Sequence, residues 1–147
     1  MDKDRLLKVK KALTFVSKKL NESKIPWLLG ASGALMVHGV NIVPYDLDIF
    51  VTKADVYRIA EVFNKYLKNP VHDYRDETGT YVECQLDIEG IEVEICELNG
   101  KEIPSGQSVN FDSEIVYVNS LEHELSFYKK RQGKEDLVKL IQEKLKK

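Results

Sequence analysis

Residues 80–98 constrain the fold more than any other stretch of the chain. They read TYVECQLDIEGIEVEICEL, an alternation of apolar and polar residues that the pair Glu89-Gly90 interrupts. Alternation with a period of two is typical of a strand that buries one face, and a two-residue turn with glycine joins antiparallel strands. With this turn, Leu86 lies opposite Val93 and the apolar residues of both strands share one face. The stretch therefore predicts a β-hairpin with a core-facing side and an acidic outer side.

The other segments show helical and strand patterns in turn. Their order predicts the α/β (α+β) class, with a mixed β-sheet flanked by helices and two helices at the C-terminus. The length of 147 residues predicts a single domain over 1–147. Apolar spacing and breaker residues predict helices at 4–21, 32–39, 53–67, 121–131 and 134–146, strands at 27–30, 45–51 and 114–118, and loops at 69–79 and 100–107.

Composition argues against several classes of protein. The chain carries 22 basic and 24 acidic side chains, a net charge of −2, so we expect no stable binding to nucleic acid. No run approaches the roughly 18 apolar residues of a membrane helix, so we expect no membrane association. Cys84 and Cys96 form no CxxC pair, which argues against zinc, and two free thiols are typical of a reducing cytoplasm. We therefore expect a cytoplasmic protein.

Two acids interrupt the otherwise apolar strand in VPYDLDIFV, residues 43–51. Asp46 and Asp48 lie two positions apart, so they share one strand face, with Cα atoms roughly 6.6–7 Å apart. Their carboxylates can converge on a divalent cation, which removes their repulsion, and Mg²⁺ prefers carboxylate and phosphate oxygens. The alternative is a solvated polar face of a half-exposed strand, which is the commoner outcome for this spacing alone.

A third acid lies on the outer face of the predicted hairpin. Glu94 is in mid-strand, and it completes a three-carboxylate cluster if its strand neighbours 45–51. The other acids of this face, Glu83, Asp87 and Glu92, are expected to be solvated. Strand periodicity does not establish which strands are neighbours.

A turn between strand and helix precedes the two aspartates. In LLGASGAL, Gly30 permits close backbone approach and Ser32 is expected to cap the following helix. Such a turn can hold a phosphate. It is not a P-loop, because no GK[ST] follows, and a capped turn without a ligand is the commoner outcome.

These features together resemble a known superfamily. Gly30-x-Ser32, Val37-His38-Gly39, Asp46-Leu47-Asp48-Ile49 and the acid after GIEV resemble the nucleotidyltransferases of DNA polymerase β type. The similarity is greatest to small one-domain members, which include lincosamide and aminoglycoside nucleotidyltransferases and uncharacterised prokaryotic relatives. It spans roughly residues 25–142.

The resemblance implies the nucleotidyltransferase fold and a metal-dependent transfer of NMP from an NTP to a hydroxyl of a small molecule or protein. It assigns Asp46, Asp48 and Glu94 to two Mg²⁺ ions, with Glu94 also a candidate general base. It assigns Gly30 and Ser32 to the phosphates of the nucleotide. The sequence leaves open which NTP is used, the acceptor and the oligomeric state.

The chain departs from close relatives at two positions and carries basic residues at its end. Ile42 and Pro44 stand where relatives often have arginine and threonine. This departure keeps a second hypothesis open, a non-catalytic nucleotide-binding or regulatory and interaction module on the same fold. The C-terminal helices carry basic residues that could reach a triphosphate, although a solvated basic face is commoner: Lys129, Lys130, Arg131 and Lys134.

Overall fold

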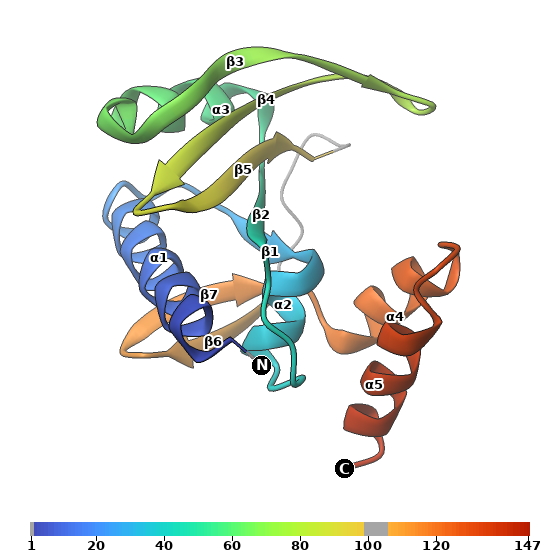
Figure 1. The fold of residues 1–147 in the computed structure, drawn as a ribbon. Coiled ribbons are helices and arrows are strands. Elements are labelled where there is room, and N and C mark those ends of the chain that lie inside the picture. Colours follow the sequence, from blue (N-terminus) through green and yellow to red (C-terminus); the bar gives the residue numbers. More distant parts are fainter. Residues whose placement is uncertain (1, 99–105) are drawn as a thin grey trace.

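The computed structural model describes residues 2–98 and 106–147. Within these ranges the chain forms five α-helices and a seven-stranded mixed sheet of order β3-β4-β5-β2-β1-β7-β6 (Figure 1). The strands are β1 (Leu28–Gly30), β2 (Asp46–Val51), β3 (Leu67–Asp76), β4 (Gly79–Ile88), β5 (Ile91–Glu97), β6 (Gln107–Phe111) and β7 (Glu114–Val118). The helices are α1 (Lys3–Glu22), α2 (Ala31–Val37), α3 (Lys53–Val62), α4 (Leu121–Lys129) and α5 (Glu135–Leu145), with a 3₁₀ turn at Asn64–Tyr66.

Strand β2 lies in the middle of the sheet. It pairs antiparallel with β1 on one side and parallel with β5 on the other. Its side chains alternate between half-buried and buried, because Leu47, Ile49 and Val51 enter the core. The fold class expected from the sequence, a mixed sheet flanked by helices, is confirmed.

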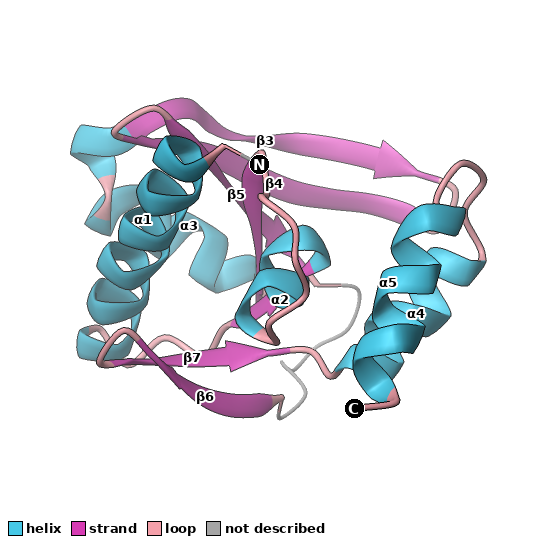
Figure 2. Ribbon diagram, turned by 60° about the horizontal axis from the view of Figure 1, so that its bottom comes forward, coloured by secondary structure: helices cyan, strands magenta, loops and turns pink. Residues whose placement is uncertain are grey.

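Helices α1, α2 and α3 pack on the core face of the sheet. In Figure 2, strands β3–β5 pass on one side of these helices and β6–β7 on the other, so the sheet wraps around them. Asp2 begins α1 as its N-cap, since its Oδ1 accepts the Arg5 N–H at 3.0 Å. The buried stripe of α1 contains Val9, Leu13, Val16 and Leu20.

The C-terminal helices α4 and α5 form a second, smaller core. Leu35 and Val40 contact Tyr128 and Ile141 in a cluster separate from the main one. The helical pair is therefore attached largely through α2, and Figure 1 shows it beside α2, away from α1 and α3. No helix in the described parts of the chain combines the length and apolar composition needed to cross a membrane.

The prediction of a loop at 69–79 is wrong, because most of this segment belongs to β3. This strand pairs with β4 at the edge of the sheet, and most of its side chains are exposed. Its register shifts between Asn69 and His72, where Pro70 cannot donate to the ladder. An exposed edge strand needs no apolar alternation, so the pattern that revealed β4 and β5 is absent here.

Other boundaries also differ from the expectations. The expected loop at 100–107 lies largely outside the described residues, and Gln107 already begins β6, a strand the sequence did not predict. The third helix ends at Val62 rather than 67, because the buried Phe63 ends it as its C-cap. The hairpin register at Glu89-Gly90 is confirmed, with Leu86 opposite Val93.

Candidate functional site

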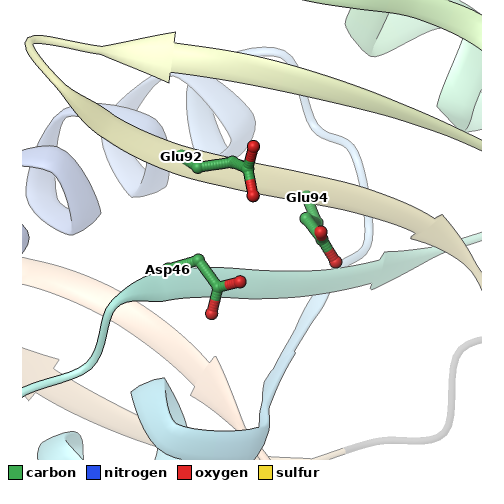
Figure 3. A group of neighbouring side chains, drawn as sticks. All are labelled: Asp46, Glu92 and Glu94. Carbon is green, nitrogen blue, oxygen red and sulfur yellow. The ribbon is translucent and has the colours of Figure 1, made fainter.

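The parallel pairing of β2 and β5 brings the predicted acids together. Asp46 lies opposite Glu92, and Asp48 lies opposite Glu94. The carboxylate oxygens of Asp46, Glu92 and Glu94 lie within 4.8 Å of one another. Figure 3 shows these three carboxylates, from two neighbouring strands, turned into the same space.

Asp48 lies next to these three acids, opposite Glu94 on the neighbouring strand. Burial, the charge of Asp46 and a hydrogen bond with Glu94 together raise the pKa of Asp48 to about 8. Burial also raises the pKa of Glu94 and, with the charge of Glu92, the pKa of Asp46. The group therefore favours a bound proton or a cation, since several adjacent carboxylates are costly to ionise together.

The donor chemistry of this cluster fits a hard divalent cation. All the converging side chains offer carboxylate oxygens, which Mg²⁺ prefers over nitrogen or sulfur ligands. Lys68 Nζ lies 3.2 Å from Glu92 Oε1, so one carboxylate at the rim already has a partner. The inner pair, Asp48 and Glu94, instead share a hydrogen bond between two acids.

Glu92 was expected to be solvated, and its placement corrects that expectation. Its side chain is 30% exposed and belongs to the carboxylate cluster. Glu83, also expected to be solvated, is 14% exposed and lies 3.7 Å from His72. Asp87 is exposed as expected, and it accepts the Gly90 N–H at 2.7 Å. Periodicity places all these acids on one face but cannot show that β2 borders it.

The Gly30–Ser32 turn lies directly beside the acids. Gly30 pairs with Asp48 across the β1–β2 ladder. Its backbone is extended, and a Cβ there would lie 2.8 Å from Phe50 Cε2, so close packing requires glycine. Ser32 does not cap α2, which corrects another expectation, since the helix begins at Ala31 with Gly30 as its N-cap and no side-chain cap bond.

Sequence reasoning missed Glu124, whose side chain bonds to the backbone of Ala31, the first residue of α2. Glu124 is 2% exposed, and its Oε1 accepts the Ala31 N–H at 2.5 Å. Burial raises its pKa to about 7. No sequence signal marks it, because it lies in an ordinary first helical turn far along the chain from Ala31.

A cavity of about 890 Å³ opens above the acids. Its walls come from the β3–β4 hairpin on one side and α4–α5 on the other, and Asp46, Asp48, Glu94 and Ser32 lie within it. The volume lies within the range typical of small-molecule sites. The remaining lining is rich in aromatic side chains, including Tyr45, Tyr74, Tyr81, Phe127 and Tyr128.

Two of the four basic residues in the C-terminal helices reach this cavity. Arg131 and Lys134 line it, whereas Lys129 and Lys130 are exposed and absent from its lining. The Arg131 guanidinium lies 4.3 Å from the centre of the Phe127 ring, which holds it against the cavity wall.

An arginine from α1 approaches the segment before Asp46. Arg5 Nε donates to Pro44 O at 3.3 Å, and its Nη2 donates to Tyr45 O. The strand was expected to begin at Tyr45, but β2 begins at Asp46 and Tyr45 is 79% exposed. The guanidinium of Arg5 therefore contacts the backbone of the loop that leads into β2.

Solved structures share this architecture. A Thermotoga maritima protein provisionally assigned as a nucleotidyltransferase superposes with a TM-score of 0.74 at 22% identity, over 99% of this chain and 96% of that chain. ANT(2″)-Ia in complex with adenylyl-2″-tobramycin gives a TM-score of 0.61 at 14% identity, over 93% and 88%. The chain has the nucleotidyltransferase fold.

The nucleotidyltransferase fold also occurs in a third similar structure, an antigenic nucleotidyltransferase-like protein from Paracoccidioides brasiliensis. Its TM-score is 0.60 at 15% identity, over 96% of this chain and 77% of that chain. No protein-family model and no curated protein matches the sequence. The superpositions establish the nucleotidyltransferase fold that the resemblance implied. Because the identities are low, the activity has to be argued from the site.

Proposed function

We propose that the protein is a metal-dependent nucleotidyltransferase, which transfers NMP from an NTP to a hydroxyl of a small molecule or a protein. The observation that carries this proposal is the carboxylate cluster on β2 and β5, which faces a cavity lined on its far side by Arg131 and Lys134. Acidic side chains, which bind cations, and basic side chains, which bind phosphates, thus face the same cavity, as transfer from a nucleoside triphosphate requires.

In this proposal Asp46, Asp48 and Glu94 hold two Mg²⁺ ions, and Glu92 adds a carboxylate at the rim. When bound, the ions would neutralise charge on the phosphates and make the acceptor hydroxyl easier to deprotonate. Arg131 and Lys134 would bind the phosphates from the far side of the cavity, and the Ser32 hydroxyl would bind them from the turn beside the acids. This division matches the positions of the lining residues.

The proposed reaction forms one bond and breaks another at the α-phosphorus. The acceptor oxygen attacks, the bond to the bridging oxygen of the β-phosphate breaks, and pyrophosphate leaves. Glu94 is the proposed general base for the hydroxyl proton, and burial raises its pKa towards the range useful for a base. Catalysis would rest on positioning and charge neutralisation.

The cavity supports a small molecule as the acceptor. Its volume leaves room beside a nucleotide, and the aromatic side chains of the β3–β4 hairpin offer flat surfaces for a ring. The similar structure of ANT(2″)-Ia is a complex with adenylyl-2″-tobramycin, a small molecule that carries an adenylyl group. We propose a cytoplasmic location, in which the free thiols of Cys84 and Cys96 remain reduced.

A transfer assay tests this function. The protein is incubated with each α-labelled NTP, Mg²⁺ and a pool of hydroxyl metabolites or lysate protein, and labelled product is separated from the NTP. We expect transfer by the wild type and a loss of about 100-fold or more in Asp48→Asn. Asp87→Asn is the matched control, since Asp87 is an exposed acid on neighbouring β4. Absence of transfer with every NTP would contradict the proposal.

The departures at Ile42 and Pro44 support a second candidate, a non-catalytic nucleotide-binding or regulatory and interaction module. Titration calorimetry with the non-hydrolysable analogue of each NTP and Mg²⁺ distinguishes the two. Binding that depends on Asp48, without transfer to any acceptor, would favour the module. Transfer of label would exclude it.

A further inference from the structure

Glu124 is a buried acid that the proposed chemistry does not use. It lies one turn into α4, is 2% exposed, and accepts the Ala31 N–H at 2.5 Å. Removing a carboxyl group from water costs free energy that a hydrogen bond only partly offsets. An apolar residue would fill the same space at a lower cost, so the bond to Ala31 is the feature that requires explanation.

Ala31 adopts a backbone conformation that alanine disfavours. Its φ is 55°, in the left-handed region where the Cβ crowds the following carbonyl oxygen. It lies between Gly30, which pairs with Asp48, and Ser32, which lines the cavity. Contacts from elsewhere in the chain therefore have to stabilise this strained residue, which sets the direction of the turn.

Residues 119–124 contact the turn from both sides. Asn119 N–H donates to Leu29 O at 3.1 Å before the turn, and Glu124 accepts from Ala31 after it. Asn119 O also lies 2.7 Å from His38 Nε2, at the far end of α2. The chain entering α4 thus holds α2 at both ends, and Figure 1 shows it passing beside this helix.

Helix α4 also carries side chains that line the cavity. Phe127 and Tyr128 follow Glu124 by one turn, and Arg131 lies just beyond the helix. The Glu124–Ala31 bond therefore connects the two parts of the chain that the proposed function assigns to the phosphates. A shift of α4 would move Arg131 and release Ala31 together.

We propose that Glu124 is a positioning residue: its hydrogen bond to Ala31 holds the Gly30–Ser32 turn beside Asp48 and fixes α4 against the nucleotide side of the site. This inference rests on the proposed function for its effect on nucleotide binding. The hydrogen bond and its effect on the turn stand independently of any ligand.

Five variants of the full chain test the proposal. Glu124→Ala removes the acceptor, Glu124→Gln keeps an oxygen at the same reach, and Glu124→Asp withdraws the carboxylate by one methylene. Ala31→Gly, combined with Glu124→Ala or Glu124→Asp, removes the steric cost of a positive φ. Glu122→Ala is the matched control, because Glu122 is an exposed acid in the same helical turn.

The first measurement is the KM of MgATP, MgGTP, MgCTP and MgUTP, with kcat from the same assay. For the NTP that supports transfer, we expect Glu124→Ala to raise KM about tenfold with a smaller change in kcat. Glu124→Gln should stay within about threefold of the wild type, and adding Ala31→Gly should recover at least about threefold. A lowered melting temperature in the Glu124 variants with KM unchanged would overturn the proposal, since packing alone would then explain the residue.

The second measurement is hydrogen exchange at the Ala31 amide, which needs no ligand. Exchange should be slow in the wild type and Glu124→Gln, and at least about tenfold faster in Glu124→Ala. Equal rates in all of these proteins would overturn the proposal. If the wild type binds none of the four nucleotides, the proposed function fails while this measurement still decides whether Glu124 holds the turn. If Glu124→Ala does not fold, Glu124→Asp serves in both measurements.

Discussion

At the scale of residues, Asp48 and Glu94 show why a bound cation would stabilise this site. Two carboxyl groups that hydrogen-bond each other must share a proton, and burial raises the pKa of Asp48 to about 8. A divalent cation binds the ionised forms, so it has to displace that proton. The same burial that makes the acids costly in an empty site makes them strong ligands once ionised.

This competition predicts a pH dependence of metal binding. Because the raised pKa favours the protonated acid, the proton competes below about pH 8, and Mn²⁺ affinity should rise up to about tenfold per pH unit between pH 6 and 8. Calorimetry in two buffers of different ionisation enthalpy would count the proton released. Asp87→Asn should keep this slope and Asp48→Asn should lose it. An affinity that is constant over this range would contradict the shared proton.

At the scale of elements, the end of α4 and the segment before α5 form a basic wall across from β2 and β5. Arg131 and Lys134 line the cavity, and Lys129 and Lys130 do not, although all four belong to one basic run. Side chains that are adjacent in a helical sequence point in different directions, so the orientation of α4 decides which basic side chains face the acids.

Substitution of these four residues should therefore give two distinct results. Arg131→Ala and Lys134→Ala should each weaken binding of an NTP by about tenfold or more, because a charge-assisted hydrogen bond to phosphate is lost. Lys129→Ala and Lys130→Ala should stay within about twofold, since their charges are solvated. Titration of each variant with the same MgNTP measures this. Similar losses in all four would point to a diffuse electrostatic effect instead of direct contact.

The elements also show where sequence patterns succeed. The β4–β5 hairpin was predicted to the correct register, because one buried face imposes a strict alternation on both strands. Strand β3 was missed because it is an edge strand with mostly exposed side chains, which leaves Tyr74 and Asp76 without any apolar alternation. The β3–β4 hairpin forms one wall of the cavity, so the sequence did not reveal this wall either.

At the scale of the whole molecule, the single domain expected over 1–147 stays a prediction. The main core and the smaller cluster around Leu35, Val40, Tyr128 and Ile141 meet at α2. If the smaller cluster depends on the main one through α2, the two should unfold together.

Ile141→Ala tests this dependence. Ile141 is fully buried in the smaller cluster, so its truncation should lower the free energy of unfolding by about 2–4 kcal/mol. The single tryptophan, Trp27, is buried in the main core and reports on it alone. Urea transitions followed by Trp27 fluorescence and by circular dichroism should coincide and shift together. A Trp27 transition that does not move would indicate two independent units.

The sequence by itself determined what depends on local periodicity. The alternation of β2 places Asp46 and Asp48 on one face, and the Glu89-Gly90 turn fixes the face on which Glu94 lies. Only the tertiary structure decided which distant segments meet. The pairing of β2 with β5 added Glu92 to the acids, and the packing of α4 on α2 brought Glu124 to Ala31. These contacts join residues far apart in the chain, and the side-chain pattern within one element carries no record of the element that will lie beside it.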